Sequence, residues 1–341
     1  MALGNGVDPA GTYPRFLARP PWWGGDLQTI RNYLRKPAIA LDPYPAERLE
    51  FPMLDGSDDA LVATLNRPLS TAGPRPLVVL IHGLTGCETS TYMRASARHL
   101  LEGGYPVLRL NLRGAGPSRP RCRLQYHAGR TEDLRTVLGC MDGRLAANGI
   151  VIVGFSLGGN MLLRYLGEQG RRAPLLGAVS VSAPIDLKAT QLRLMQRRNR
   201  RYHDHLLARM KEEITAPDSR LSDLERARLD TISSVYEFDD RVVAPRNDFA
   251  NADDYYARCS AKSLLGEIRV PTLLIHARND PWIPPNAYLA FDWDSNPRLT
   301  PLLPKGGGHV GFHGFGNSVP WHDRCIASFL DRLMAARAGR R

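Results

Sequence analysis

Short apolar runs alternate with amphipathic segments over most of the chain from about residue 49 onward. The apolar runs predict strands at 61–68, 76–83, 105–114, 150–156 and 175–184. The segments between them predict helices at 89–104, 131–149 and 157–170. A continuous apolar run such as 76–83 is typical of a strand that is buried on both faces. The alternation therefore predicts an α/β fold, with a mostly parallel central sheet and helices on both of its faces.

The alternation stops between residues 185 and 262. This segment is polar, has helical periodicity and contains no apolar run of strand length. Ser222 and Glu225 have the spacing of a capping box, which predicts that a helix begins there. Helices inserted between two strands of one sheet predict a lid over the carboxyl ends of the strands, where open α/β sheets place their sites.

The strand pattern resumes after this insertion, at 270–277 and 298–304, and a last helix is predicted at 321–338. We therefore expect one catalytic core with an inserted lid rather than two independent domains. The expected division is an N-terminal arm at 1–48, a core at 49–184 and 263–341, and a helical lid at 185–262.

The sequence Gly154-Phe155-Ser156-Leu157-Gly158 has the form G-x-S-x-G and lies between a predicted strand and a predicted helix. In such a turn neighbouring backbone comes close to both glycine positions, so a side chain would not fit easily there. The turn also places the serine hydroxyl at a helix N-terminus, which favours developing negative charge. An incidental serine in a glycine-rich turn is the alternative, but the context favours a nucleophile at Ser156.

A serine nucleophile needs a base, and the base needs an acid to orient it. In this kind of fold the acid follows the serine in the chain and the histidine comes last. Asp280 follows the predicted strand at 270–277, which places it at the expected edge of the sheet. A turn-forming role ahead of Pro281 is the alternative. Five rival aspartates in the inserted segment have no strand before them: Asp239, Asp240, Asp248, Asp253 and Asp254.

His309 follows the last predicted strand through a loop of three glycines. His313 is its nearest rival, and His322 lies in the final helix, where a surface or packing role is expected. His82 and His127 precede Ser156 and so break the chain order. The pattern therefore favours His309 as the base.

An oxyanion site for such a serine needs two N–H donors. One is expected from the backbone of Leu157, directly after the nucleophile. The other is expected from the loop at 82–86, where the residue after His-Gly is Leu84.

Composition adds few constraints. The chain has 341 residues, of which 43% are hydrophobic and 23% charged, as in globular proteins with a large core. The five cysteines form no C-x-x-C pair, so neither a disulfide framework nor a cysteine zinc site is predicted. We expect no metal and no cofactor. The sequence shows no signal peptide and no apolar run that could span a bilayer, so a cytoplasmic protein, at most peripheral to a membrane, is expected.

The formal net charge of +11 raises the question of nucleic acid or anionic lipid as a partner. No helix-turn-helix, RRM or zinc-finger pattern accompanies the charge, so we expect no nucleic-acid binding. Part of the charge lies at 188–211, where apolar residues recur at near-helical spacing. A basic amphipathic lid helix could contact an anionic membrane. A solvated outer face is the simpler interpretation, which we favour. The oligomeric state stays open.

Taken together, the motifs resemble the YheT-like branch of the α/β-hydrolase superfamily, whose eukaryotic members are membrane-associated esterases and phospholipases. The resemblance covers nearly the whole chain. It rests on PPWW (20–23), LQTI (27–30), HGLTG (82–86), NLRGAGPS (111–118), YHAGRTEDL (126–134), GFSLGGN (154–160), DDYYARCS (253–260), ARNDP (277–281) and GGHVGF (307–312). Asp26 departs from the family pattern, in which many relatives have histidine. His127 recurs in that pattern, and a packing or supporting role is expected for it.

The resemblance implies hydrolysis of carboxylic esters, with short- to medium-chain acyl esters or acylglycerols as substrates. It supports Ser156, Asp280 and His309 individually, because each lies in a matching motif. Two alternatives remain: an acyltransferase that passes the acyl group to an alcohol, and a non-catalytic binding protein on a hydrolase fold.

Overall fold

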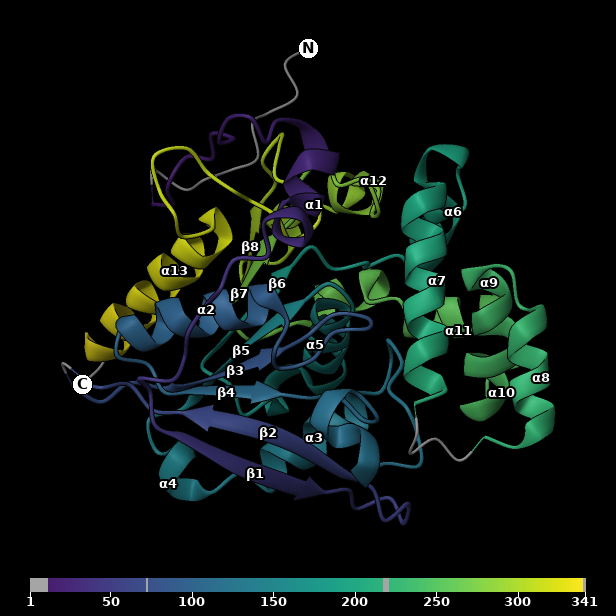
Figure 1. The fold of residues 1–341 in the computed structure, drawn as a ribbon. Coiled ribbons are helices and arrows are strands. Elements are labelled where there is room, and N and C mark those ends of the chain that lie inside the picture. The colour runs from purple at the N-terminus through teal and green to yellow at the C-terminus, as the bar shows by residue number, and fades with distance from the viewer. Residues whose placement is uncertain (1–11, 72, 217–220, 340–341) are drawn as a thin grey trace.

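The computed structural model describes residues 12–71, 73–216 and 221–339, and its central feature is one eight-stranded sheet (Figure 1). The strand order is β1-β2-β4-β3-β5-β6-β7-β8. β1 pairs antiparallel with β2 and β2 antiparallel with β4, while all other neighbours are parallel. The bounds are β1 Ala46–Pro52, β2 Ala60–Asn66, β3 Leu77–Ile81, β4 Val107–Leu110, β5 Ile150–Phe155, β6 Gly177–Val181, β7 Thr272–Ile275 and β8 Leu299–Leu302. The predicted mostly parallel sheet is confirmed.

The apolar runs form strands because both faces of the sheet are covered. Every residue of β2 through β7 is buried. Along β3, Leu77, Val79 and Ile81 join one apolar cluster, whereas Val78 and Leu80 join another. Because side chains alternate between the two faces of a strand, these two clusters are the two cores of one three-layer molecule.

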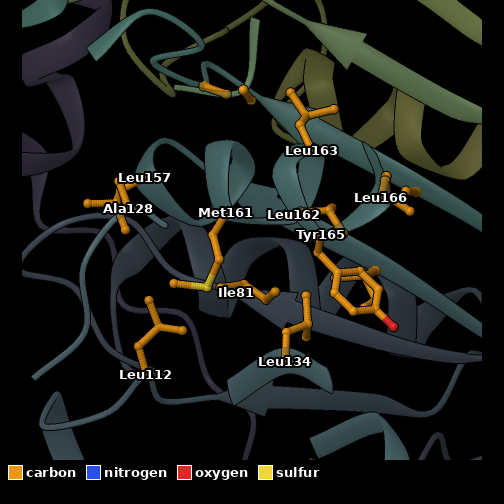
Figure 2. Packing of buried hydrophobic residues seen from close by; sticks show 14 of the residues in the cluster. Ile81, Leu112, Ala128, Leu134, Leu157, Met161, Leu162, Leu163, Tyr165 and Leu166 are labelled. Atoms are coloured by element: carbon orange, nitrogen blue, oxygen red, sulfur yellow. The ribbon is translucent and has the colours of Figure 1, made fainter. Parts of the chain in front are cut away.

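Helices α2 (Thr91–Glu102) and α13 (Trp321–Ala338) pack into one of these cores. Helices α3 (Thr131–Gly139) and α5 (Leu157–Gln169) pack into the other. Figure 2 shows the second core, in which Met161 and Leu162 of α5 meet Ile81 of β3 and Leu134 of α3. This packing holds the start of α5 against the end of β5.

The inserted segment between β6 and β7 is helical, as predicted. Its elements are α6 (Leu187–Leu194), α7 (Arg200–Ile214), α8 (Asp223–Thr231), α9 (Val235–Phe238), a π-helical turn (Asp239–Val243), α10 (Ala244–Arg246) and α11 (Ala252–Cys259). The predicted capping box of Ser222 and Glu225 is present at the start of α8. These helices share a third apolar cluster, which includes Leu206 and Phe238. They stand to one side of the sheet in Figure 1.

The structure differs from the sequence predictions in three places. The helix predicted at 131–149 is two helices, α3 and α4 (Gly143–Ala146), because Asp142 accepts a hydrogen bond from the amide of Arg144 and begins a new helix. The pattern missed α1 (Gly24–Arg35) in the N-terminal arm. It also missed β1, which begins at Ala46, within the predicted arm. The core also contains short helical elements, at α12 (Asn286–Ala290) and in 3₁₀ turns at Gly116–Arg121, Gly170–Arg172, Lys262–Glu267 and Trp293–Ser295.

A buried arginine joins the loops around the antiparallel strands. Arg113 follows β4, is 1% exposed and donates to Asp59 and Asp133, and its ion pair with Asp55 is 2.9 Å long. Burial alone would lower the pKa of Arg113, but the hydrogen bonds and charges of these carboxylates raise it. The arginine therefore compensates carboxylates that would otherwise be buried without a counter-charge.

Arg113→Met is expected to destabilise the protein by about 3–5 kcal/mol, because Asp59 would remain buried without a counter-charge. Asp133 would keep only the longer ion pair with Arg130, at 3.6 Å. Arg121→Met is the matched control, since Arg121 pairs with Glu50 at the surface, where both side chains are about half exposed. The control should cost no more than about 1 kcal/mol. Urea unfolding of both variants measures the difference, and equal losses would contradict the assignment.

Candidate active site

Ser156 lies between β5 and α5 in a backbone conformation that is rare for a residue with a side chain. Its φ is 49° and its ψ is −121°. A Cβ at Gly154 would lie 2.5 Å from the carbonyl oxygen of Gly158, and one at Gly158 would lie 2.5 Å from that of His82. Both positions of the motif therefore require glycine. Such strained conformations cluster at functional sites, where the surrounding structure enforces them.

The structure brings the three residues singled out from the sequence into one hydrogen-bonded series. His309 Nε2 lies 3.0 Å from Ser156 Oγ, and His309 Nδ1 lies 2.8 Å from Asp280 Oδ2. His309 is 7% exposed and Asp280 is 2% exposed. Because the carboxylate of Asp280 accepts a hydrogen bond from the Nδ1–H of His309, Nε2 is left unprotonated and can accept the hydroxyl proton of Ser156.

Asp280 is held rigidly after β7. Its Oδ1 accepts hydrogen bonds from the amides of Trp282 (2.8 Å) and Ile283 (3.0 Å). Burial by itself would raise the pKa of Asp280, but the charge and hydrogen bond of His309 lower it below the ordinary value. The carboxyl group therefore stays ionised beside the imidazole.

The loop of His309 is held by the N-terminal arm, a contact that the sequence pattern did not reveal. The amide of His309 donates to Thr29 Oγ1 of α1 at 2.8 Å. A Cβ at Gly308 would lie 2.4 Å from the carbonyl oxygen of Gly25, so the loop packs directly on α1. The indole of Trp282 stacks on the imidazole of His309, with ring centroids 4.4 Å apart. The LQTI motif at 27–30, which contains Thr29, was the sequence feature that could have indicated this contact.

The rival histidines have other contacts. Gln28 of α1 binds both backbone groups of His313, whose Nδ1 lies 3.4 Å from Arg31. Burial and the charges of Arg31 and Arg19 lower the pKa of His313 to about 3. His82 accepts the amide of Leu112 through Nε2, at 3.0 Å. The imidazoles of His313 and His82 therefore lie outside the hydrogen-bonded series of Ser156, His309 and Asp280.

The other two histidines fill packing positions. His127 Nδ1 accepts the amide of Gly129, and its ring meets Phe249 and Tyr255 edge-on. Burial lowers the pKa of His127 to about 3. His322 is 1% exposed and lies edge-on to Phe155.

Two backbone amides beside Ser156 are available to a ligand. Within the described residues, neither Leu84 N–H nor Leu157 N–H has a hydrogen-bond acceptor. Leu157 begins α5, so its amide also carries the partial positive charge of a helix N-terminus. Both residues line the same cavity as Ser156 and His309.

This cavity has a volume of about 1010 Å³. The core contributes Ser156 and Leu84, the arm contributes Ile30 and Tyr33, and the inserted segment supplies a largely apolar wall. That wall includes Leu187, Leu194, Leu206, Met210, Val235 and Phe238. Glu213 of α7 also lines the cavity, and burial raises the pKa of its carboxyl group to about 7. The arrangement can enclose an apolar chain whose reactive end lies at Ser156.

Asp26, which departs from the family pattern, joins the arm to the inserted segment. Its carboxylate accepts from Arg198 at 2.9 Å and from the hydroxyl of Tyr202 on α7 at 3.0 Å. Tyr202 in turn meets Trp282 edge-on, with ring centroids 5.6 Å apart. The residue therefore connects α1, α7 and the ring that stacks on His309.

The described residues contain neither a metal-binding cluster nor a membrane-spanning helix. No cluster of three or more His, Cys, Asp or Glu side chains there could hold a metal ion. No helix in that part of the chain is both long and apolar enough to cross a bilayer.

Comparisons with known proteins concern the fold and the family. A family model described as the alpha/beta hydrolase fold matches residues 76–315. The chain is 32% identical to "Putative esterase YheT" of Escherichia coli (strain K12), over 92% of each chain. It is 30% identical to "Medium-chain fatty acid ethyl ester synthase/esterase 2" of Saccharomyces cerevisiae, covering 76% of this chain and 62% of that protein. It is 28% identical to the "Monoacylglycerol lipase" of the same yeast, covering 77% and 60%.

Solved structures show the same fold. The Pyrococcus furiosus esterase Pf2001 matches with a TM-score of 0.58, over 94% of this chain and 97% of that one. At 18% sequence identity, this likeness concerns the fold alone.

Proposed function

The chain belongs to the α/β-hydrolase family, in its YheT-like branch, and on that premise we propose that it is a serine esterase acting through an acyl-enzyme on Ser156. The observation that carries the proposal is the hydrogen-bonded series Ser156–His309–Asp280, which opens into a large apolar cavity. The esterases and the lipase among its relatives support ester hydrolysis as the reaction class.

In the proposed reaction, Ser156 Oγ attacks the acyl carbonyl carbon while His309 Nε2 takes the hydroxyl proton. The carbonyl oxygen becomes an oxyanion, which accepts hydrogen bonds from the amides of Leu84 and Leu157. Asp280 stabilises the imidazolium and keeps Nδ1 protonated. His309 then gives its proton to the departing alcohol, and the acyl group stays on Ser156. Water then attacks the acyl carbonyl carbon while His309 takes its proton. The bond to Ser156 Oγ breaks, the serine regains its proton from His309, and the acid is released.

The proposed substrates are short- to medium-chain acyl esters or acylglycerols. A cavity of about 1010 Å³ is at the upper end of the usual range for small-molecule sites. Its apolar wall suits an acyl chain. In this proposal residues 185–262 act as the lid, because they supply about half of the residues that line the cavity.

Acyl transfer to an alcohol is the second candidate. The yeast relative that is named both ester synthase and esterase supports it. The two reactions share the acyl-enzyme and differ in the acceptor, so the same residues serve both. A non-catalytic binding role is disfavoured, because it would not require a serine hydrogen-bonded to a histidine that is itself oriented by a carboxylate.

The basic outer face of the lid raises the question of contact with an anionic lipid surface. In α7 the apolar residues Leu206, Leu207 and Met210 are buried in the inserted cluster, whereas Arg200 and Arg201 are exposed. The apolar face of α7 is therefore occupied within the protein. We propose that α7 contacts anionic lipid through charge alone, without insertion of apolar side chains.

Ser156→Ala is expected to lower kcat/KM for a 4-nitrophenyl ester by at least about 10⁴-fold, because the nucleophile is lost. A fluorophosphonate probe should label the wild type and leave Ser156→Ala unlabelled. Ser328→Ala, on α13, is the control and should label normally. A folded wild-type protein without labelling would contradict the hydrolase proposal, and a labelled Ser156→Ala would contradict the nucleophile assignment.

A series of 4-nitrophenyl esters graded by acyl length should give its highest kcat/KM at short to medium chains. Adding ethanol separates the two candidate reactions, since transfer yields an ethyl ester and hydrolysis yields the acid. We expect the acid as the main product at low alcohol concentration, as measured by gas chromatography. A main ethyl ester product under those conditions would favour the second candidate.

Sedimentation with phosphatidylserine vesicles tests the charge-only contact. We expect binding at about 10 mM salt that is lost at about 150 mM, because screening weakens exposed charges. Phosphatidylcholine vesicles are the control and should not bind. Binding that survives 150 mM salt would contradict the proposal, and so would the absence of binding at 10 mM.

A further inference from the structure

The loop after β3 has an unusual arrangement of backbone donors. Gly83 N–H donates to the hydroxyl of Tyr92 at 2.8 Å, and Thr85 N–H donates to the hydroxyl of Tyr126 at 2.7 Å. Gly86 N–H donates to the carbonyl oxygen of Gly83. Of the four amides from 83 to 86, that of Leu84 alone has no acceptor in the described part of the chain. Two tyrosine hydroxyls thus bind the amides on either side of the proposed oxyanion donor.

The loop needs such restraint because its backbone is strained and its placement is tight. Thr85 has a φ of 56°, a left-handed conformation that costs a β-branched residue of order 1–3 kcal/mol. A Cβ at Gly83 would lie 2.9 Å from Ser156 Cβ, so the loop rests directly on the nucleophile. A small rotation of the Leu84 peptide would therefore turn its N–H away from an oxyanion formed at Ser156.

The two tyrosines reach the loop from separate elements. Tyr92 lies in the first turn of α2, and Tyr126 belongs to the YHAGRTEDL segment, for which sequence analysis gave no chemical role. Tyr126 is 8% exposed. A hydroxyl that accepts a backbone N–H can also donate its own proton. Tyr126 donates to Glu213 Oε2 at 2.9 Å.

Glu213 extends this chain of hydrogen bonds into the inserted segment. It lies near the end of α7, whose residues also line the cavity above Ser156. The series Thr85 N–H, Tyr126 O–H and Glu213 carboxylate therefore connects the oxyanion loop to the helix that forms part of the cavity wall.

We propose that Tyr92 and Tyr126 are positioning residues that fix the Leu84 N–H toward the oxyanion, and that Glu213 couples this alignment to the placement of α7. The proposal rests on the proposed function, since it concerns the oxyanion of that reaction. The alignment of the Leu84 N–H stabilises the transition state, in which the oxyanion is present, and leaves binding of the acyl chain unchanged.

Replacement by phenylalanine separates this role from packing, because it removes the hydroxyl and keeps the ring. Tyr126→Phe and Tyr92→Phe should each lower kcat by about 10–100-fold, somewhat less than the loss of an oxyanion donor itself, with KM within about twofold. Tyr165→Phe is the control. Tyr165 is a buried tyrosine at the opposite end of α5 from Leu157 (Figure 2), and its variant should keep wild-type kcat.

A transition-state analogue gives a readout that packing would not change. A trifluoromethyl ketone adds to Ser156 Oγ and forms a hemiketal whose oxygen occupies the oxyanion position. Its inhibition constant should rise in each Tyr→Phe variant by the same factor as kcat/KM falls. Affinity for the product acid, which forms no oxyanion, should stay within about twofold. An unchanged inhibition constant, or an equal loss of product-acid affinity, would overturn the positioning role.

Variants at Glu213 test the coupling to α7. Glu213→Gln keeps an acceptor for the Tyr126 hydroxyl and should keep kcat within about threefold of wild type. Glu213→Leu removes the acceptor and should lower kcat as Tyr126→Phe does, without a further loss in the double variant. Additive losses in the double variant would contradict the coupling, because independent residues contribute additively.

Fluorophosphonate labelling keeps the two hypotheses distinguishable. If the folded wild type is unlabelled, the proposed function itself fails. If the wild type is labelled and hydrolyses esters while both Tyr→Phe variants keep full kcat and inhibitor affinity, the positioning proposal alone fails. Thermal unfolding of each variant confirms that the compared proteins are folded.

Discussion

The turn at Ser156 is the constraint on which the rest of the site depends. A residue with a side chain adopts a φ of 49° only when its surroundings prevent relaxation. Here β5 is paired on both sides, by β3 and β6, and the first residues of α5 lie in the core. The amide of Ser156 donates to the carbonyl oxygen of Val181 at the end of β6. The buried strands β3, β5 and β6 thus fix the hydroxyl in one position, and every other group has to be brought to it.

The groups that reach this position come from loops, and each loop is held by a neighbour distant in sequence. The His309 loop rests on α1, and the loop at 83–86 rests on Tyr92 and Tyr126. Asp280 is the exception, since it is held by the amides of its own turn. The sheet therefore supplies rigidity, while long-range hydrogen bonds from side chains to loop amides supply alignment.

The sequence predicted those features that leave a periodic or local signature. Buried parallel strands are apolar along their whole length, so β3, β5 and β7 could be identified directly. The chain order of the family and the position after a strand were enough to nominate Asp280 and His309, which the structure brings to Ser156. Both properties are visible in the order of residues along the chain, and they need no knowledge of which segments meet in space.

The remaining features depend on contacts between distant segments, which no local pattern encodes. Thr29 was visible only as part of a motif, because a threonine that accepts an amide 280 residues away looks like any other threonine on a helix. The pairing of Tyr126 with Glu213 was equally hidden, because it joins residues 87 positions apart in the chain. The break between α3 and α4 was missed for a different reason: Asp142 caps a new helix inside a stretch whose apolar spacing looks continuous.

The support that α1 gives to the His309 loop also has a consequence for synthesis. Thr29 leaves the ribosome 280 residues before the amide that it will bind. At about 5–20 residues per second, this corresponds to a delay of roughly fifteen seconds to a minute. During that interval the sheet can begin to form around β3, β5 and β6, while the amide that Thr29 will bind has not yet been synthesised. The proposed site is thus completed only after His309 has been synthesised, when its loop comes to rest on α1.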